Sequence, residues 1–168
     1  MQIVELPSLW TAGWFILPVA AIALWVSWSD MKFMKIPNTA VLTLFAVYLV
    51  IGPIALPFQT WLWGIALGLI TLVAGFIATS LRLVGAGDSK FAAAMAPFFA
   101  GSSPDLVFLL FAGCLLAAFG AHRLLRAIPA FRAATPDWAS WTHRKFPMGL
   151  ALSGTILFYF LLGLLISA

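Results

Sequence analysis

The chain has 168 residues, of which 64% are apolar and only 8% carry a charge. The charged fraction is about one third of that in an average soluble protein, too small to hydrate the surface of a globular domain. This composition excludes a cytosolic enzyme, a disordered tail and a disulfide-stapled secreted module. The net charge of +4 comes from basic residues scattered between apolar runs, unlike a nucleic-acid-binding face. The sequence therefore predicts an integral membrane protein.

Uncharged apolar stretches predict five helices near the length of about 20 residues that crosses a bilayer. They are Leu9–Trp28, Thr39–Phe58, Trp61–Leu81, Leu106–Ala121 and Pro147–Ser167. A sixth stretch, Phe91–Ala100, covers only about half of the hydrocarbon layer at about 1.5 Å per residue. To cross, its helix must begin near Leu83 or Val84. That start would place Val84–Lys90 at membrane depth, or in a re-entrant turn that lines a polar cavity.

The basic residues support six spans with both termini outside. In that topology all nine lie on the cytoplasmic side, as the positive-inside rule requires. They are Lys32, Lys35, Arg82, Lys90, Arg123, Arg126, Arg132, Arg144 and Lys145. The outer loops carry only Glu5 and Asp105. We therefore predict an all-α polytopic bundle of about six helices that forms a single integral-membrane domain over residues 1–168.

The longest polar stretch is Arg123–Phe146. Pro129 and Pro136 prevent one continuous helix there. The stretch is interpreted as a broken helix along the cytoplasmic leaflet. An alternative is that it shapes the entry of a substrate that arrives from the membrane.

Two acidic residues stand out because a carboxylate inside a membrane segment costs several kcal/mol unless it faces a polar cavity. Asp30 closes the first span, and Asp88 lies in the submerged start of the fourth. The predicted topology places both at the cytoplasmic end of the bundle. The other three acids, Glu5, Asp105 and Asp137, are expected to be solvated.

Two carboxyl groups at one depth suit the hydrolysis of a peptide bond. One is ionised and accepts a proton from water, while the other is protonated and donates to the scissile carbonyl. Such a pair holds one proton between its members. Gly85 and Gly87, which precede Asp88, allow a close approach of the backbone to a neighbouring helix or peptide. Lys90 is expected to be one of the basic residues that mark the cytoplasmic side of the membrane. The alternative is that it tunes the ionisation of the Asp88 carboxylate.

After Asp30, the segment Ile36-Pro37-Asn38 predicts a turn that positions this acid against the second span. Pro37 disfavours helix at Ile36, and Asn38 is expected to cap the next helix. The lone Cys114 is expected to be a packing residue. His122 and His143 are expected to contact lipid headgroups, so no metal and no cofactor are predicted.

These motifs resemble those of the type IV prepilin peptidases, which are intramembrane aspartic peptidases of the GxGD type. The resemblance rests on Asp30 with Ile36-Pro37-Asn38, on Gly85-Ala86-Gly87-Asp88-Ser89-Lys90-Phe91 and, more weakly, on Phe146-Pro147-Met148-Gly149 with Gly154. It extends over nearly the whole chain and departs from many relatives at Ser89. It implies that Asp30 and Asp88 are the catalytic dyad. The residues expected to support the dyad are Gly85, Gly87, Lys90, Ile36, Pro37 and Asn38.

The resemblance also implies an activity and a location. It suggests an aspartic endopeptidase that cuts the leader from type IV or Flp-type prepilins or pseudopilins, just ahead of the substrate's apolar helix. The expected site is the cytoplasmic face of the bacterial inner membrane, with the bilayer and the prepilin as partners and no nucleic acid. The chain resembles the short type without an N-methyltransferase region, which is associated with Flp or tight-adherence pili. No covalent intermediate is expected.

Two alternatives stay open at this point. The aspartates of a non-enzymatic assembly factor, or of a small proton- or ion-coupled transporter, would form a conduction path. Many transporters are built from two repeated halves, and the sequence shows no such repeat. The other alternative is a GxGD peptidase that acts on a different client, such as a signal peptide.

Overall fold

The computed structural model describes residues 6–166, and within that range it contains helices and no strand. Glu5 and Ser167 lie outside the described residues. The helices are α1 (Leu9–Phe33), α2 (Asn38–Ala55), α3 (Phe58–Ser80), α4 (Ala86–Met95), η1 (Ala96–Phe99), α5 (Pro104–Ala127), α6 (Pro129–Ala134), η2 (Ala139–Trp141) and α7 (Met148–Ile166). Five of these, α1, α2, α3, α5 and α7, are long and apolar enough to cross a membrane. The chain is therefore an all-helical membrane protein.

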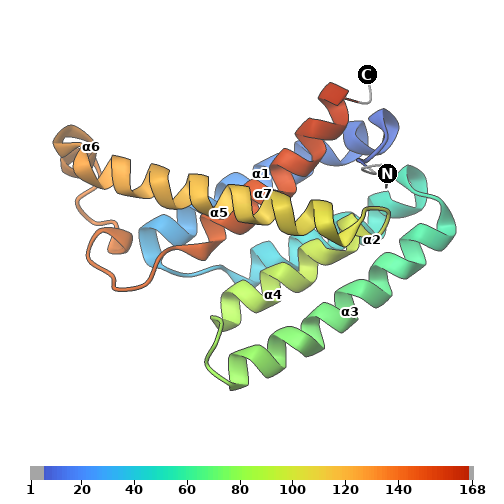
Figure 1. The fold of residues 1–168 in the computed structure, drawn as a ribbon, viewed down its shortest axis with the longest axis horizontal. Coiled ribbons are helices and arrows are strands. Elements are labelled where there is room, and N and C mark those ends of the chain that lie inside the picture. The colour runs from blue at the N-terminus through green and yellow to red at the C-terminus, as the bar shows by residue number, and fades with distance from the viewer. Residues whose placement is uncertain (1–5, 167–168) are drawn as a thin grey trace.

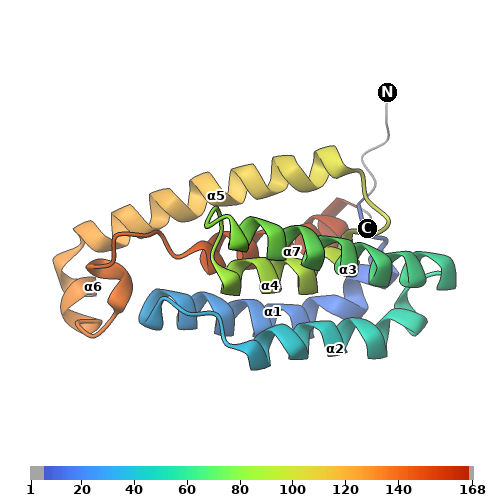
Figure 2. The ribbon, with the colours of Figure 1, turned by 90° about the horizontal axis from the view of Figure 1, so that it is seen from below.

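The long helices form a layered bundle. Helix α7 packs between α1 and α5, α2 packs on α1, and α3 packs on α4. Figure 1 shows α5 crossing in front of α7, with α3 beside α4 along one edge of the molecule. Figure 2 shows α5 on one side of the bundle and α1 with α2 on the other, with α4 and α7 between them. This arrangement brings the start of α4 and the start of α7 to the end of the bundle where α1 ends.

The fourth helix differs from its prediction. A start near Leu83 or Val84 is wrong, because α4 begins at Ala86. The preceding residues close α3 instead: the N–H of Arg82 donates to Thr79, and that of Leu83 donates to Ala78. Arg82 adopts a left-handed conformation with φ 59° in this turn.

At its other end, α4 tightens into the 3-10 helix η1 around Pro97, which lacks the N–H that would continue the α-helical bonds. Helices α4 and η1 together rise about 23 Å, less than a hydrocarbon layer of about 30 Å. The count of six spans and the sides on which the termini lie therefore stay predictions.

The polar stretch Arg123–Phe146 is a broken helix, as predicted, and its place along the cytoplasmic leaflet stays a prediction. Helix α5 ends at Ala127 and α6 starts at Pro129, which occupies the first helical position. The prediction that His122 contacts headgroups is wrong. Its ring is buried and stacks on Trp141, with 5.3 Å between the ring centroids. The segment of η2 thus folds back over the end of α5.

An aromatic cluster joins four elements at the centre of the bundle. Phe98 of η1 contacts Phe15 of α1 at 5.0 Å and Tyr48 of α2 at 5.1 Å between ring centroids. Phe160 of α7 lies 5.9 Å from Phe98. All four side chains are buried. Inside a membrane such packing, rather than transfer out of water, holds helices together.

Helix α3 is joined to this cluster at a glycine. The Tyr48 hydroxyl donates to the carbonyl of Trp61 at 3.0 Å. A Cβ at Gly64 would overlap the Tyr48 hydroxyl and would lie 2.8 Å from the carbonyl oxygen of Pro97. Only a residue without a side chain therefore fits where α3 meets α2 and η1.

We predict that Gly64→Ala lowers the thermal unfolding midpoint of the detergent-solubilised protein by several degrees. Overpacking a tight contact costs about 1–3 kcal/mol, which outweighs the gain in helix propensity of about 1 kcal/mol. Gly113→Ala is the matched control, since a Cβ there meets nothing within 4 Å. Tryptophan fluorescence during heating measures the midpoints, and equal midpoints for the two variants would contradict this packing.

Candidate active site

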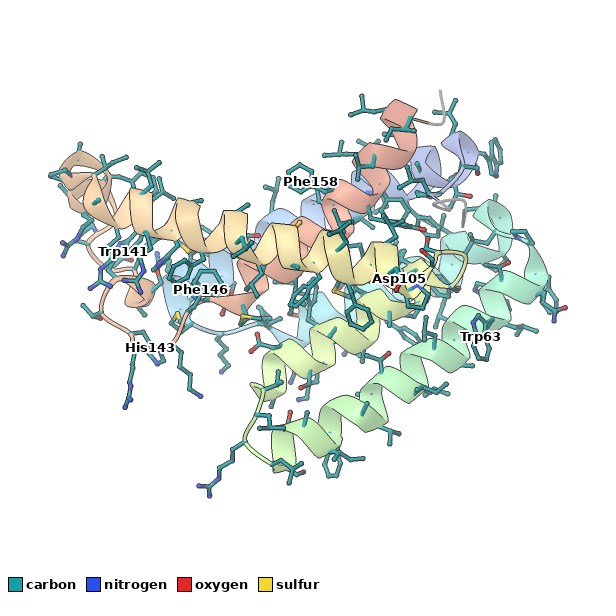
Figure 3. The ribbon with its side chains drawn as sticks, viewed as in Figure 1. Trp63, Asp105, Trp141, His143, Phe146 and Phe158 are labelled. Carbon is teal, nitrogen blue, oxygen red and sulfur yellow. The ribbon has the colours of Figure 1, made fainter. Side chains whose placement is uncertain are left out.

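A polar cavity of about 440 Å³ opens where α1 ends and where α2, α4 and α7 begin. Both intramembrane acids predicted from the sequence, Asp30 and Asp88, line it. The segment that leads into α7 closes one side. Figure 3 shows His143 and Phe146 of this segment at the end of the bundle away from Asp105. The cavity therefore gathers residues that are far apart in the sequence.

Asp30 lies in the last turns of α1 and is only 5% exposed. Its Oδ2 atom accepts a hydrogen bond of 2.7 Å from the backbone N–H of Gly149. Gly149 is the second residue of α7, where N–H groups have no acceptor within the helix. The positive end of the α7 dipole also faces the carboxylate. Helix α7 thus supplies the polar partner that a buried carboxylate needs.

The close approach of α7 to Asp30 requires a glycine. A Cβ at Gly149 would lie 2.9 Å from the Asp30 Oδ2 and 3.0 Å from the Asp30 Cβ. Met34 ends α1 in the left-handed conformation, and its N–H donates to the Asp30 carbonyl at 2.9 Å. Backbone contacts on two sides therefore fix this residue.

Asp88 is the third residue of α4 and is half-buried. Its carboxylate lies close to the backbone of Gly85, the residue that precedes the helix, and the Gly85 N–H favours the charged form. A Cβ at Gly85 would lie 2.6 Å from the Asp88 Oδ2, so the glycine leaves room for the carboxylate. The Asp88 charge is close enough to act on Asp30.

The two sequence motifs contact each other beside the acids. A Cβ at Gly87 would lie 3.4 Å from the Cβ of Ile36, which is buried. The Lys90 ammonium donates to the Asn38 side-chain oxygen at 3.3 Å. The turn after α1 therefore docks on the start of α4.

The structure corrects the expected role of Asn38. The residue that precedes α2 is Pro37, and no side chain caps the helix there. Asn38 is the first residue of α2 and accepts the bond from Lys90. Of the predicted supporting residues, five line the cavity and Pro37 does not. The five are Ile36, Asn38, Gly85, Gly87 and Lys90.

Sequence reasoning missed the contribution of the segment before α7. His143, Lys145 and Phe146 line the cavity. The charge of Lys145 attracts the Asp88 carboxylate, and His143 lies close enough to Asp30 to act on its carboxylate. These residues have no helical periodicity, and the only signal near them is the Pro-containing element that begins at Phe146. Among residues 6–166, no three His, Cys, Asp or Glu side chains gather as ligands for a metal ion.

An ion pair attaches the same segment to α1. Lys32 Nζ lies 2.9 Å from the Oδ2 of Asp137, which is largely exposed. The hydrogen bond from Lys32 holds the pKa of Asp137 below its usual value. The pair is therefore intact at neutral pH and is lost as the pH falls through that lowered pKa.

A comparison with models of protein families shows the family to which the chain belongs. The model of the type IV leader peptidase family matches residues 17–121. No curated protein and no solved structure matches the chain. The matched segment is more than half of the sequence and contains Asp30, Asp88 and the motifs around them. The chain therefore belongs to the type IV leader peptidase family, as its resemblance to the prepilin peptidases predicted.

Proposed function

We propose that this protein is an aspartic endopeptidase whose dyad, Asp30 and Asp88, removes the leader from prepilin-type substrates. Family membership implies a peptidase with prepilin-type substrates in general. The observation that carries the finer proposal is the shared cavity, in which both carboxylates are held at helix N-termini. A cavity of about 440 Å³ has room for a short stretch of peptide with a water molecule.

The proposed reaction needs one proton between the two acids, because like charges at close range do not both ionise. The ionised carboxylate takes a proton from water as the water oxygen adds to the scissile carbonyl carbon. The protonated carboxyl gives its proton to the carbonyl oxygen. Collapse of the resulting gem-diol breaks the C–N bond, and the departing amine takes up a proton. No bond forms between enzyme and substrate.

The location and the substrate subtype are part of the proposal. The cavity is lined by Lys35, Lys90 and Lys145, and the positive-inside rule favours such an end on the cytoplasmic side. This supports cleavage at the cytoplasmic face of the bacterial inner membrane by one peptidase domain. Type IV or Flp-type prepilins or pseudopilins are the proposed clients, because the two aspartate motifs resemble those of the prepilin peptidases.

We predict that Asp30→Asn and Asp88→Asn, made separately, each lower leader removal at least about 100-fold, because each removes a proton-transfer group. Asparagine keeps a hydrogen-bond acceptor for the N–H of Gly149 or Gly85, so the fold is retained. The assay is the gel mobility of a prepilin in membranes that contain the enzyme.

Asp105→Asn is the matched control, because Asp105 lies at the other end of the bundle (Figure 3). It should process the prepilin like the wild type. Substantial processing by either dyad variant would contradict the assignment. A flux of ions that needs both acids, without any change in substrate mass, would favour the transporter alternative.

We predict that Gly149→Ala lowers kcat about 100-fold while KM changes little, because the added methyl group displaces the Asp30 carboxylate and misplaces a reacting group. Gly154→Ala on the same helix is the control, since its Cβ would make an ordinary contact of 3.6 Å with Cys114. Both variants are purified in detergent and compared by steady-state cleavage and thermal unfolding. Equal kcat values for the two would show that Asp30 does not depend on this glycine.

A further inference from the structure

An apolar groove of about 410 Å³ lies next to the active-site cavity, between α2, α3 and α4. Its walls are Leu42 and Phe45 of α2 with Leu69 and Leu72 of α3, and its floor is Ala93 and Ala94 of α4. Asn38 and Lys90 line both the groove and the active-site cavity. The hydrogen bond between these two side chains therefore marks the boundary between the polar cavity and the apolar groove.

The groove exists because α2 and α3 both lie near α4 but contact each other little. Gly68 brings α3 close to α4 and η1: a Cβ there would lie 3.3 Å from the carbonyl oxygen of Ala93 in α4 and 3.0 Å from the Pro97 side chain in η1. The small side chains of the floor then leave space between the two walls. Leu42 is 66% exposed and Leu69 is 57% exposed, so each wall presents a large apolar side chain to the groove.

The groove leads away from the active site into the apolar body of the bundle. Helices α2 and α4 both begin at the cavity and run in that direction. From Asn38 to Phe45 the wall extends about 10 Å along the helix axis. A chain that leaves the cavity along this path therefore passes from polar to apolar surroundings within two helical turns.

We propose that this groove binds the apolar helix of the substrate, in the segment that directly follows the scissile bond. The inference rests on the proposed function. Cleavage directly ahead of an apolar helix requires an apolar surface that this helix can occupy next to the active-site cavity. A helix of about 10 Å diameter packs best against small residues, which the floor provides. The groove between α3, α4 and α5 and the one between α1, α5 and α7 share no residue with the active-site cavity.

The first test is photocross-linking in membranes. A benzophenone amino acid replaces Leu42 or Leu69 in the full chain that also carries Asp88→Asn, so that the uncleaved prepilin stays bound. Adducts with the prepilin are expected from both positions. Leu116 on α5, which is 74% exposed and lines none of these grooves, is the matched control. Adducts with lipid alone, or equal prepilin adducts from all three positions, would overturn the proposal.

The second test fills the groove and compares two substrates. One is the full-length prepilin, and the other is a soluble peptide that contains the scissile bond but ends before the apolar helix. Leu69→Trp is expected to lower the ratio of kcat/KM for the prepilin to that for the peptide about tenfold, by a rise in KM for the prepilin. Leu116→Trp is expected to leave this ratio unchanged.

These outcomes separate the two proposals. If the wild type cleaves neither substrate, the proposed function fails and the groove has no such occupant. If the wild type cleaves the prepilin and Leu69→Trp has the same ratio as Leu116→Trp, only the groove proposal is overturned.

Discussion

The hydrogen bond between the N–H of Gly149 and the carboxylate of Asp30 is the contact on which the polar end of the bundle depends. A carboxylate within a membrane helix is costly unless a polar group faces it. Helix α7 provides that group with its unpaired N-terminal N–H, at a distance of 2.7 Å. The same physical solution recurs on α4, where the N–H of Gly85 faces the carboxylate of Asp88. Two acids thus lie beside one cavity because two helices begin there.

The glycines around the cavity have separate steric roles. Gly149 lets α7 approach Asp30, Gly85 leaves room for the carboxylate of Asp88, and Gly87 lies against Ile36. The spacing Gly-x-Gly-Asp therefore combines two constraints at the start of one helix. Gly85 leaves room for the Asp88 carboxylate, and Gly87 allows the contact with the turn after α1. This explains in physical terms why two motifs that lie about fifty residues apart in the sequence meet in the structure.

Reasoning from the sequence found the two acids because the cost of burying charge in a membrane is large and local. It missed His143 and Lys145 because an irregular polar segment has no periodicity from which the orientation of its side chains can be predicted. It placed His122 at the headgroups because the stacking partner, Trp141, comes from a later segment that folds back. The start of α4 was set too early because the prediction required a helix that crosses the whole bilayer. Residues up to Leu83 instead form the turn that closes α3, and α4 is therefore shorter than predicted.

The short α4 joins two environments that a leader peptidase needs side by side. Hydrolysis requires water and ionisable groups, whereas the helix of a membrane-bound substrate requires an apolar surface. Asp88 lies in the first turn of α4, and Ala93 on the groove floor follows five residues later, a rise of about 7.5 Å. A longer apolar helix at this position would carry Asp88 away from the bundle interior, and bulkier side chains would close the groove. The polar start and small side chains of α4 therefore set the distance between the acidic cavity and the apolar groove.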